Sequence, residues 1–473
     1  MTGDTCSRRR RMTVPVRIGR VAIGGDNPIA VQSMTNTPTM DTVASADQII
    51  RIAEAGGDIV RLTAQTPAHA RNLGEIRRLV RERGCEVPLV ADIHYNPAAA
   101  FAAAEEVEKV RINPGNFVDP GRKFEQHEYT DEEYAAELAR LREAFVPFLD
   151  LCASRGVAIR LGVNHGSLSD RIRNRYGDTP EGMVESAMEF LRIAVERGFT
   201  DVVISIKSSN VVVMTRTVRL LAETMEREGM AFPLHLGVTE AGDGDDGRIK
   251  SAVGIGSLLV DGLGDTIRVS LSEDPEREIP VARKILAHVA RTDAPGRIRR
   301  AVAAGNGDVT VSYPAGMSPE DVKIAAAVDL GYALLEIEGV TDNIRIEAPS
   351  LTDDECRRLE LDILQATRRK ITKTEYIACP SCGRTLFDLQ RALAEVKAAT
   401  AGLKGLKIGV MGCIVNGPGE MADADYGYVG AGPGRVSLYK GQTCVVKNIK
   451  AEEALPRLIQ LIKDNGDWPD ESV

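Results

Sequence analysis

Three cysteines near the carboxyl-terminal end of the chain could hold a metal centre. Cys379 and Cys382 form a Cys-x-x-Cys pair in ACPSCGR, and Cys413 follows in MGCIVNGPGE, a glycine-rich stretch that ends at Glu420. Structural zinc normally has four cysteine or histidine ligands at paired spacings, but residues 371–473 contain neither a second such pair nor a histidine. Three thiolates and one exchangeable ligand suit a [4Fe–4S] cluster that reacts at one iron. Zinc bound by the three cysteines and Glu420 remains the alternative.

The composition is that of a globular protein with two or three domains. Of the 473 residues, 43% are hydrophobic and 27% charged, and the net charge of -9 argues against a general nucleic-acid or membrane-surface binder. No apolar run approaches the roughly 20 residues of a membrane span, and no apolar segment follows the basic run near the start. Eight cysteines are too few for a disulfide framework, so we expect a reducing, cytoplasmic location.

Eight short apolar segments alternate with amphipathic helical patterns over the first 290 residues. Such alternation predicts right-handed crossovers and a parallel sheet, and eight units in this length favour a closed TIM (β/α)8 barrel. No G-x-G-x-x-G follows the first strand, which counts against a dinucleotide-binding fold. The predicted strands are residues 29–35, 59–64, 88–94, 109–115, 158–164, 201–207, 233–240 and 265–271.

The remaining segments predict a second, smaller α/β unit and an insertion before it. We expect an N-terminal tail over residues 1–20, the barrel over 21–292 and a short inserted α/β segment over 293–370. Residues 371–473 combine the cysteine loops with strand-like and helical stretches, and we expect them to form the iron–sulfur domain.

Five cations are predicted at the carboxyl ends of five barrel strands, where barrel enzymes place their chemistry. A cation buried at a strand end lowers the stability of the fold by several kcal/mol unless it is paired. Either local salt bridges or a bound anion must therefore neutralise these five charges. Guanidinium groups bind phosphate oxygens in pairs, which favours a phosphate or diphosphate ligand, with asparagine and serine side chains filling the other acceptor positions. These candidate binding residues are Arg61, Arg111, Asn113, Arg160, Asn164, Lys207, Arg268 and Ser270.

Three histidines and one acid lie at the same predicted strand ends. His94, His165 and His235 could bind a metal, but isolated histidines in such places more often form hydrogen bonds, so we interpret His165 and His235 as candidate substrate-binding residues. Glu240 is either a counter-ion for the arginines or a proton donor near the reacting carbon. The acidic run at residues 243–247 behind it is interpreted as a solvated, flexible loop.

Several of these stretches resemble the (E)-4-hydroxy-3-methylbut-2-enyl diphosphate synthases of the methylerythritol phosphate route to isoprenoids. The similar motifs are ACPSCGR, MGCIVNGPGE, RINPGN, LHLGVTEAG, DGLGDTIRVSL and the early VQSMTNTPTMDTVAS, and the likeness covers roughly residues 15–290 and 371–450. The resemblance implies a TIM barrel joined to a small α/β domain with a [4Fe–4S] cluster. It also implies a two-electron reductive ring opening and dehydroxylation of 2-C-methyl-D-erythritol 2,4-cyclodiphosphate, with ferredoxin or flavodoxin as electron donor.

The resemblance also assigns roles to the candidate residues. It implies that Cys379, Cys382, Cys413 and Glu420 are the cluster ligands and that Glu240 acts near the departing hydroxyl. The same barrel residues, from Arg61 to Ser270, would bind the cyclodiphosphate.

The inserted segment departs from the family's short form, which passes almost directly from barrel to cluster domain. Longer plant-type members carry a whole extra domain there, for which residues 293–370 are too short. Short members are head-to-tail homodimers in which one subunit's cluster covers the other's barrel, so a homodimer is expected. Two other interpretations are a barrel lyase or aldolase that acts on a phosphorylated substrate and carries a structural zinc domain, and a non-enzymatic metal-responsive protein. The non-enzymatic interpretation leaves the five cations at the strand ends unexplained.

Overall fold

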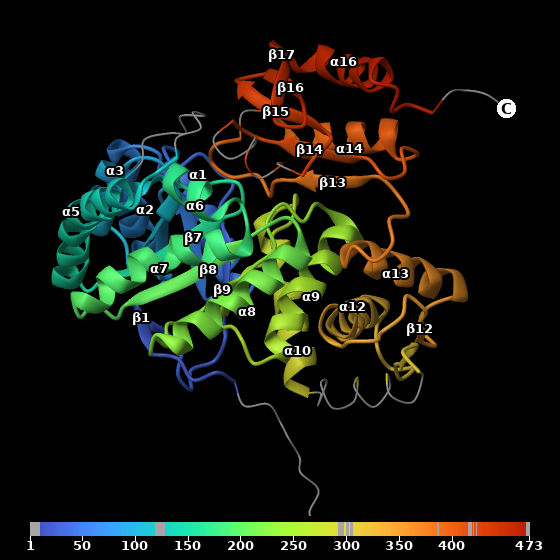
Figure 1. The fold of residues 1–473 in the computed structure, drawn as a ribbon, viewed down its shortest axis with the longest axis horizontal. Helices are drawn as coiled ribbons and strands as arrows, with labels where there is room; N and C mark the ends of the chain where they lie inside the picture. Colours follow the sequence, from blue (N-terminus) through green and yellow to red (C-terminus); the bar gives the residue numbers. More distant parts are fainter. Residues whose placement is uncertain are drawn as a thin grey trace, which may run out of the picture.

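The fold was analysed in a computed structural model of the chain. The residues it describes are 10–118, 128–291, 298, 302, 306–385, 387–414, 419, 421 and 423–469. Figure 1 shows a large body built from the first two thirds of the chain, with a smaller carboxyl-terminal unit seated on it.

Eight parallel strands form a closed barrel in the large body. Neighbours along the sheet follow the order β8-β7-β6-β5-β4-β3-β10-β9, and a parallel bridge between Ile204 and Leu234 closes the circle. All eight predicted strands and the predicted barrel are therefore confirmed. The strands are β3 (Ala30–Met34), β4 (Ile59–Thr63), β5 (Leu89–Asp92), β6 (Lys109–Ile112), β7 (Ala158–Asn164), β8 (Val202–Lys207), β9 (His235–Leu236) and β10 (Thr266–Ile267).

Helices cover the outside of the barrel, each with a buried apolar face. Their ends follow from local chemistry: α2 begins after Thr66, whose hydroxyl accepts a hydrogen bond from the His69 N–H, and Gly84 with φ +80° follows its end. The helices are α1 (Thr42–Glu54), α2 (Pro67–Glu82), α3 (Pro97–Ala104), α4 (Pro114–Phe117), α5 (Asp131–Arg155), α6 (Asp170–Tyr176), α7 (Pro180–Glu196), α8 (Val211–Arg227), α9 (Gly244–Val260), η1 (Pro275–Arg277) and α10 (Glu278–Arg291).

A β-hairpin closes the bottom of the barrel. It consists of β1 (Val16–Ile18) and β2 (Val21–Ile23), whose buried Val16, Ile18 and Ile23 form one apolar cluster with the lowest inward-facing barrel residues, such as Ile59 and Val90. The sequence analysis placed residues 16–18 in an N-terminal tail, and for these residues that interpretation was wrong. Residues 1–9 of that tail lie outside the described part of the chain.

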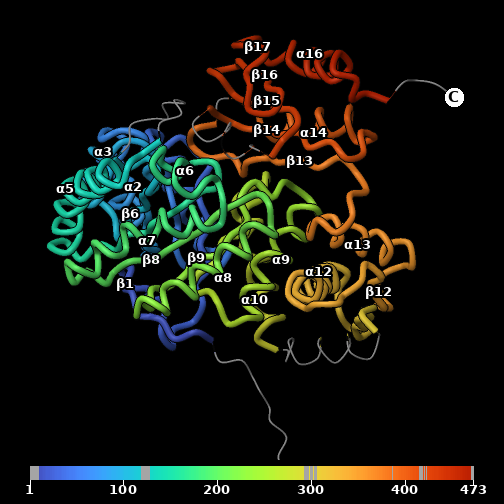
Figure 2. The backbone as a smooth tube through the Cα atoms, in the orientation of Figure 1, coloured from blue at the N-terminus to red at the C-terminus, as the bar shows by residue number. Residues whose placement is uncertain are grey.

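The inserted segment packs on the side of the barrel. Its β11 (Val309–Ser312) and β12 (Ile344–Glu347) form a parallel pair, and α12 (Pro319–Glu336) lies along α9 (Figures 1 and 2). A Cβ atom at Gly256 would lie 2.6 Å from the Val328 side chain, and one at Gly331 would lie 2.9 Å from that of Val253, so the two glycines allow this close approach. Helix α13 (Asp353–Ala366) then leads towards the carboxyl-terminal unit.

A five-stranded sheet forms the carboxyl-terminal unit. Its strands follow one another in chain order, β13 (Glu375–Ala378), β14 (Lys407–Met411), β15 (Tyr426–Gly432), β16 (Arg435–Lys440) and β17 (Thr443–Lys450), and the first three are parallel. Helices α14 (Leu389–Thr400) and α16 (Ala451–Asp464) bury apolar residues against it. The predicted small α/β unit is thus present, while the exact domain boundaries stay predictions.

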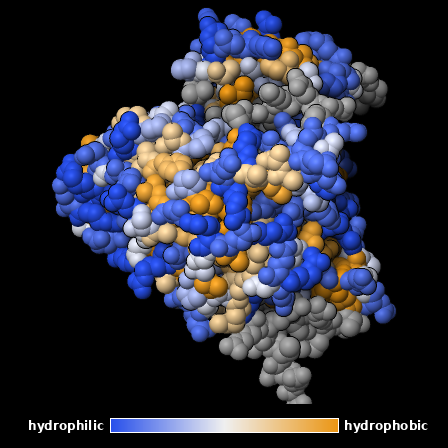
Figure 3. Space-filling model, turned by 60° about the vertical axis from the view of Figure 1, so that its left-hand side comes forward, coloured by the Kyte–Doolittle hydropathy of each residue, from blue (hydrophilic) through white to orange (hydrophobic). Residues whose placement is uncertain are grey.

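The face of the molecule in Figure 3 carries both hydrophilic and hydrophobic residues. The face in Figure 3 is a mosaic in which hydrophilic residues surround small hydrophobic areas, as is usual for folded proteins. Within the described residues, none of the helices has both the length and the apolar character needed to span a bilayer.

The hairpin under the barrel should contribute measurably to stability. We expect Ile18→Ala to lower the free energy of unfolding by about 2–5 kcal/mol, because it leaves a cavity in a fully buried apolar cluster. Arg17→Ala, on the exposed face of the same strand, is the control and should change it by less than about 0.5 kcal/mol. Equal effects in urea unfolding would contradict the proposed closing role.

Candidate active site

A cavity lies between the carboxyl ends of the barrel strands and the loops of the carboxyl-terminal unit. Both parts of the same chain line it. The barrel contributes Met34, Arg61, Asp92, His94, Arg111, Asn164, Lys207, Thr239, Glu240, Arg268 and Ser270, and the smaller unit contributes Cys379, Pro380, Ser381, Cys382, Arg384, Met411, Gly412 and Cys413. Four of the five predicted cations, all except Arg160, and the three predicted metal-ligating cysteines therefore face one space.

Backbone contacts seat the cysteine loops on the barrel. A parallel bridge joins Ala241, just behind β9, to Ala378 at the end of β13, and the Ser272 hydroxyl donates to the Cys379 carbonyl at 2.9 Å. A Cβ at Gly383 would lie 2.6 Å from the Thr37 carbonyl oxygen. Only glycine fits such an approach, so the sequence of the Cys-x-x-Cys loop is adapted to the barrel loop it touches.

The glycine-rich loop behind Cys413 also touches the barrel. A Cβ at Gly166, in the loop after β7, would lie 2.2 Å from the carbonyl oxygen of Gly419. Glu420, the predicted fourth cluster ligand, lies outside the described residues, but its neighbour Gly419 is in direct contact with the barrel mouth.

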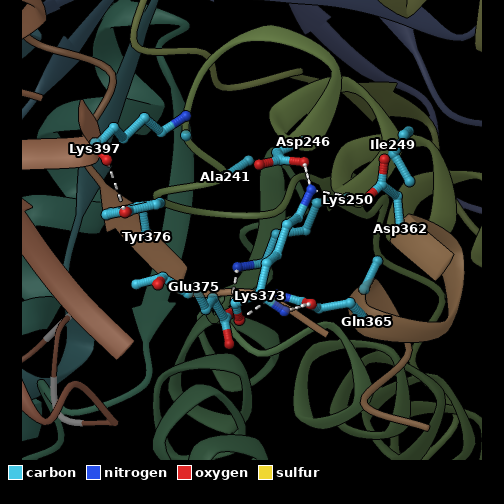
Figure 4. A pocket seen from close by; sticks show the side chains of 13 residues that line it. Ala241, Asp246, Ile249, Lys250, Asp362, Gln365, Lys373, Glu375, Tyr376 and Lys397 are labelled. Carbon is cyan, nitrogen blue, oxygen red and sulfur yellow. Dashed lines mark hydrogen bonds and ion pairs between the residues drawn. The ribbon is translucent and has the colours of Figure 1, made fainter. Parts of the chain in front are cut away.

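A group of ion pairs, which we call the latch, holds the smaller unit beside the cavity (Figure 4). Lys373 lies 2.5 Å from Asp246 and 2.7 Å from Asp362, and Glu375 lies 3.1 Å from Lys250. Lys397 and Arg368 add further pairs, to Asp243 and Glu375.

The interpretation of residues 243–247 as a flexible loop was wrong: they enter α9, and acids in a first helical turn are favoured by the helix dipole.

Two of the five predicted cations are neutralised within the barrel. Arg111 donates to Asp92 at 3.0 Å and to the Asn164 side-chain oxygen at 2.9 Å, and a Cβ at Gly162 would lie 2.3 Å from its Nε. Arg268 donates to both carboxylate oxygens of Glu278, at 3.0 and 3.1 Å. These two pairs fix the guanidinium planes at the rim of the cavity.

The other three cations have no such partner. Among the described residues no carboxylate forms an ion pair with Arg61, Arg160 or Lys207, although all three are buried. Burial lowers the pKa of Arg61 to about 10, with Arg268 and Arg111 adding to the effect and Asp92 opposing it. Burial and neighbouring arginines also hold the pKa values of Arg160 and Lys207 well below their usual ranges. An anion would relieve this cost, so the arrangement supports an anionic ligand.

Four predicted residues lie elsewhere. Arg160 is in the layer below the cavity, and its Nε and Nη1 have no hydrogen-bond partner. His235 is also deeper, with its Nδ1 3.4 Å from the Thr266 hydroxyl, and burial lowers its pKa well below the usual value, so it is neutral. Asn113 accepts from the Gly115 N–H at the start of α4, and His165 lies 3.7 Å from Asp178.

The three thiols have the chemistry of cluster ligands. The Gly412 N–H donates to the Cys379 sulfur at 3.2 Å, and Arg384 Nε donates to the Cys382 sulfur at 3.4 Å. Burial, and then the neighbouring Cys382, raise the pKa of Cys379 well above its usual value, a shift that a bound cation would reverse. In the described part of the chain, no three His, Cys, Asp or Glu side chains are placed to share one metal ion. Cysteine thiolates bind both zinc and iron–sulfur clusters, so the three thiols fit the predicted metal centre.

Glu240 faces the cysteines from the barrel side. It is 5% exposed and has φ +48°, and Ser381 between the two cysteines of the pair has φ +57°. Left-handed backbone in non-glycine residues costs about 1–3 kcal/mol and tends to occur at functional sites. Glu240 is thus held where its carboxyl group meets both the cations and the thiols.

The sequence analysis did not select Asp92, His94 or Arg384 as site residues, although it considered His94 as a metal ligand. Asp92 is the last residue of β5 and His94 lies two residues beyond it, while Arg384 lies two residues after Cys382. The sequence showed that Asp92 and His94 lie at a strand end and that Arg384 lies beside the Cys-x-x-Cys pair. Whether these side chains reach the cavity depends on how the two parts of the chain meet, which the sequence did not show.

Comparisons with known proteins agree with this geometry. The model of the GcpE TIM-barrel domain matches residues 13–283, and that of the GcpE protein C-terminal domain matches residues 375–464. The chain belongs to the GcpE family. This confirms the family predicted from the motifs, and it argues against both the lyase with a zinc domain and the non-enzymatic protein.

Relatives match this family member over nearly their whole length. A protein of Parabacteroides distasonis named 4-hydroxy-3-methylbut-2-en-1-yl diphosphate synthase (flavodoxin) is 48% identical, with 97% of this chain and 98% of the relative covered. A Bacteroides fragilis protein of the same name is 46% identical, with 99% and 98% covered. The first alignment spans 602 positions against the 473 residues here, so the relative contains long stretches with no counterpart in this chain.

Two buried arginines should respond oppositely to the same substitution. Replacing Arg160 by methionine should raise the free energy of unfolding of the ligand-free protein by about 1–4 kcal/mol, because it removes a buried charge without a carboxylate partner. Inorganic diphosphate should raise the melting temperature of the Arg160→Met variant by less than it raises that of the unaltered protein.

Arg171→Met is the matched control for that experiment. Arg171 is equally buried but lies 2.7 Å from Glu189, so its loss should lower the free energy of unfolding by about 3–5 kcal/mol. Destabilisation by Arg160→Met with an unchanged diphosphate effect would show that Arg160 is a structural residue only.

Proposed function

We propose that this chain is a flavodoxin-dependent 4-hydroxy-3-methylbut-2-en-1-yl diphosphate synthase. It reductively opens the ring of 2-C-methyl-D-erythritol 2,4-cyclodiphosphate and removes a hydroxyl group, using two electrons. The observation that carries the proposal is a single cavity in which unpaired cations, one strained glutamate and three cysteines meet. Membership in the GcpE family supports it.

The cations would bind the diphosphate part of the substrate. Arg61 and Lys207 line the cavity without a carboxylate partner in the described residues, and Arg160 lies just below them. Arg111 and Arg268, held by Asp92 and Glu278, keep N–H groups at the rim at fixed angles. Bidentate contacts to phosphate oxygens would then hold the ring in one orientation, with Asn164 and Ser270 as further hydrogen-bonding groups.

The donor set fits an iron–sulfur cluster. Cys379, Cys382 and Cys413 would hold it together with Glu420, on the side of the cavity opposite the cations. When bound, a [4Fe–4S] cluster supplies electrons one at a time, as a two-electron reduction by flavodoxin requires. A carboxylate binds iron less firmly than a thiolate does. Glu420 as fourth ligand would therefore suit a cluster that reacts at the iron it binds.

Glu240 would supply the proton. Two electrons alone cannot release a hydroxyl group as water, so a proton must reach the departing oxygen. Glu240 is buried at the cavity wall between the substrate-binding cations and the cysteines, where its carboxyl group can donate that proton. The closed junction with the smaller unit would exclude bulk water from the reduced substrate.

One chain contributes both halves of this cavity. Barrel and cysteine loops meet within the same molecule here, so the site does not require a second subunit to cover the barrel. The homodimer expected from the resemblance remains a prediction.

Purification without oxygen tests the cofactor and the activity together. The protein should be brown, contain iron and acid-labile sulfide in equal amounts, and convert the cyclodiphosphate when reduced flavodoxin is supplied. Cys413→Ser should lose most of the iron and the activity, whereas Cys444→Ser should keep both, because Cys444 lies on β17 and does not line the cavity. A colourless wild-type protein that contains zinc and no sulfide would overturn the proposal.

Glu420→Ala tests the fourth ligand separately. The variant should retain Cys379, Cys382 and Cys413 as ligands but lose iron more readily, and turnover should fall at least about 100-fold. The control is Glu453→Ala, an exposed acid in the first turn of α16. Wild-type turnover with a full iron content in Glu420→Ala would show that another group completes the site.

A further inference from the structure

Arg384 is a cation that the smaller unit extends into the barrel mouth. It lies two residues after Cys382, in the turn where Gly383 meets the barrel loop, and it is 8% exposed. Its Nη2 is 3.5 Å from Asp92 Oδ2, and its Nε donates to the Cys382 sulfur at 3.4 Å. One guanidinium group thus contacts a predicted cluster ligand and a barrel carboxylate at the same time.

Asp92 is shared between the two parts of the chain. Its Oδ1 accepts from Arg111 at 3.0 Å, while its Oδ2 faces Arg384. Arg111 in turn donates to the Asn164 side chain and to the Gly162 carbonyl, at 2.9 and 2.8 Å. The contacts therefore form an unbroken buried path from Cys382 through Arg384 and Asp92 to Arg111.

This path exists only when the smaller unit is seated on the barrel. Asp92 and Arg111 both belong to barrel strands, so their pair is present in any arrangement of the two units. The pair of Asp92 with Arg384 crosses the junction, and both groups are nearly inaccessible to water there, where an ion pair is far stronger than on a surface. Separation of the units would leave Asp92 with one guanidinium partner fewer.

We propose that Asp92 and Arg384 form a clasp that couples the seating of the cysteine domain to the geometry of the substrate-binding Arg111. Both are positioning residues: Asp92 orients Arg111, and Arg384 orients Cys382 and fixes the domain. The part of the inference that concerns substrate rests on the proposed function. The part that concerns the seating of the domain does not.

A double-mutant cycle tests the clasp. In the cluster-loaded protein, Asp92→Asn and Arg384→Gln should each speed amide hydrogen exchange in residues 376–385, the segment that joins β13 to the cysteine loop. Each should raise KM for the cyclodiphosphate by at least about tenfold, with a smaller change in kcat. Because the two residues act as one unit, the double variant should be no worse than the more affected single variant.

Two further variants sharpen the result. Arg391→Gln, an exposed arginine that pairs with Glu395 inside α14, is the control and should leave exchange and KM unchanged. Arg384→Lys keeps the charge but not the planar fork, so it should restore part of the exchange protection and lose the contact to Cys382, which shifts the electron paramagnetic resonance spectrum of the reduced cluster.

The outcomes separate the clasp from the proposed function. Additive effects, or unchanged exchange in both single variants, would overturn the clasp. If Arg384→Gln fails to retain iron, the test of the clasp rests on Asp92→Asn alone. Asp92 touches no cysteine, so this substitution should leave the cluster in place and still speed amide exchange in residues 376–385. If the wild-type protein did not turn over the cyclodiphosphate, the proposed function would fail, while the exchange measurements would still report on the clasp.

Discussion

The structure depends on an excess of buried positive charge at the mouth of the barrel. Arg61, Arg160 and Lys207 are buried, and no carboxylate in the described residues pairs with them. Such an arrangement lowers the stability of the ligand-free protein, so the rest of the fold must stabilise it. The apolar hairpin below the barrel and the helices around it supply that stability. The unpaired charge is then available to an anionic substrate.

The smaller unit meets this charge with groups of complementary character. Its three cysteines face the cations across one cavity, and its backbone approaches the barrel at positions where glycine is required, such as Gly383 and Gly166. The latch around Lys373 and Glu375 lies outside the cavity and uses ordinary acid–base pairs. These latch pairs involve none of the side chains that line the cavity, and the Asp92–Arg384 contact is an ion pair across the junction that lies inside it.

Much of the fold could be predicted from sequence because its signals are local. Apolar segments of strand length, separated by amphipathic helices, predicted all eight barrel strands. The three cysteines predicted to bind a metal line one cavity, but their role as ligands stays a prediction. The failures had a common cause. Residues 16–18 and 243–247 are short segments whose structure is decided by distant partners, the barrel floor in one case and Lys373 and Lys397 in the other. His235 was placed on the right strand, but its depth in the barrel was not visible. Asn113 was placed on a strand that ends one residue earlier, and it caps α4 instead.

The sequence by itself determined the kinds of chemistry that this protein can perform. Residue types are fixed in the chain. The spacing of Cys379, Cys382 and Cys413 favoured a metal centre, and the arginines at strand ends favoured an anionic ligand. Only the tertiary structure decided which charges are neutralised. Arg268 is paired through Glu278 on α10 and Arg111 through Asp92 on a neighbouring strand, whereas Arg61 donates to the Met34 sulfur and pairs with no carboxylate in the described part of the chain. Electrostatic pairing depends on distance in space and on burial, and neither quantity is encoded in local sequence periodicity.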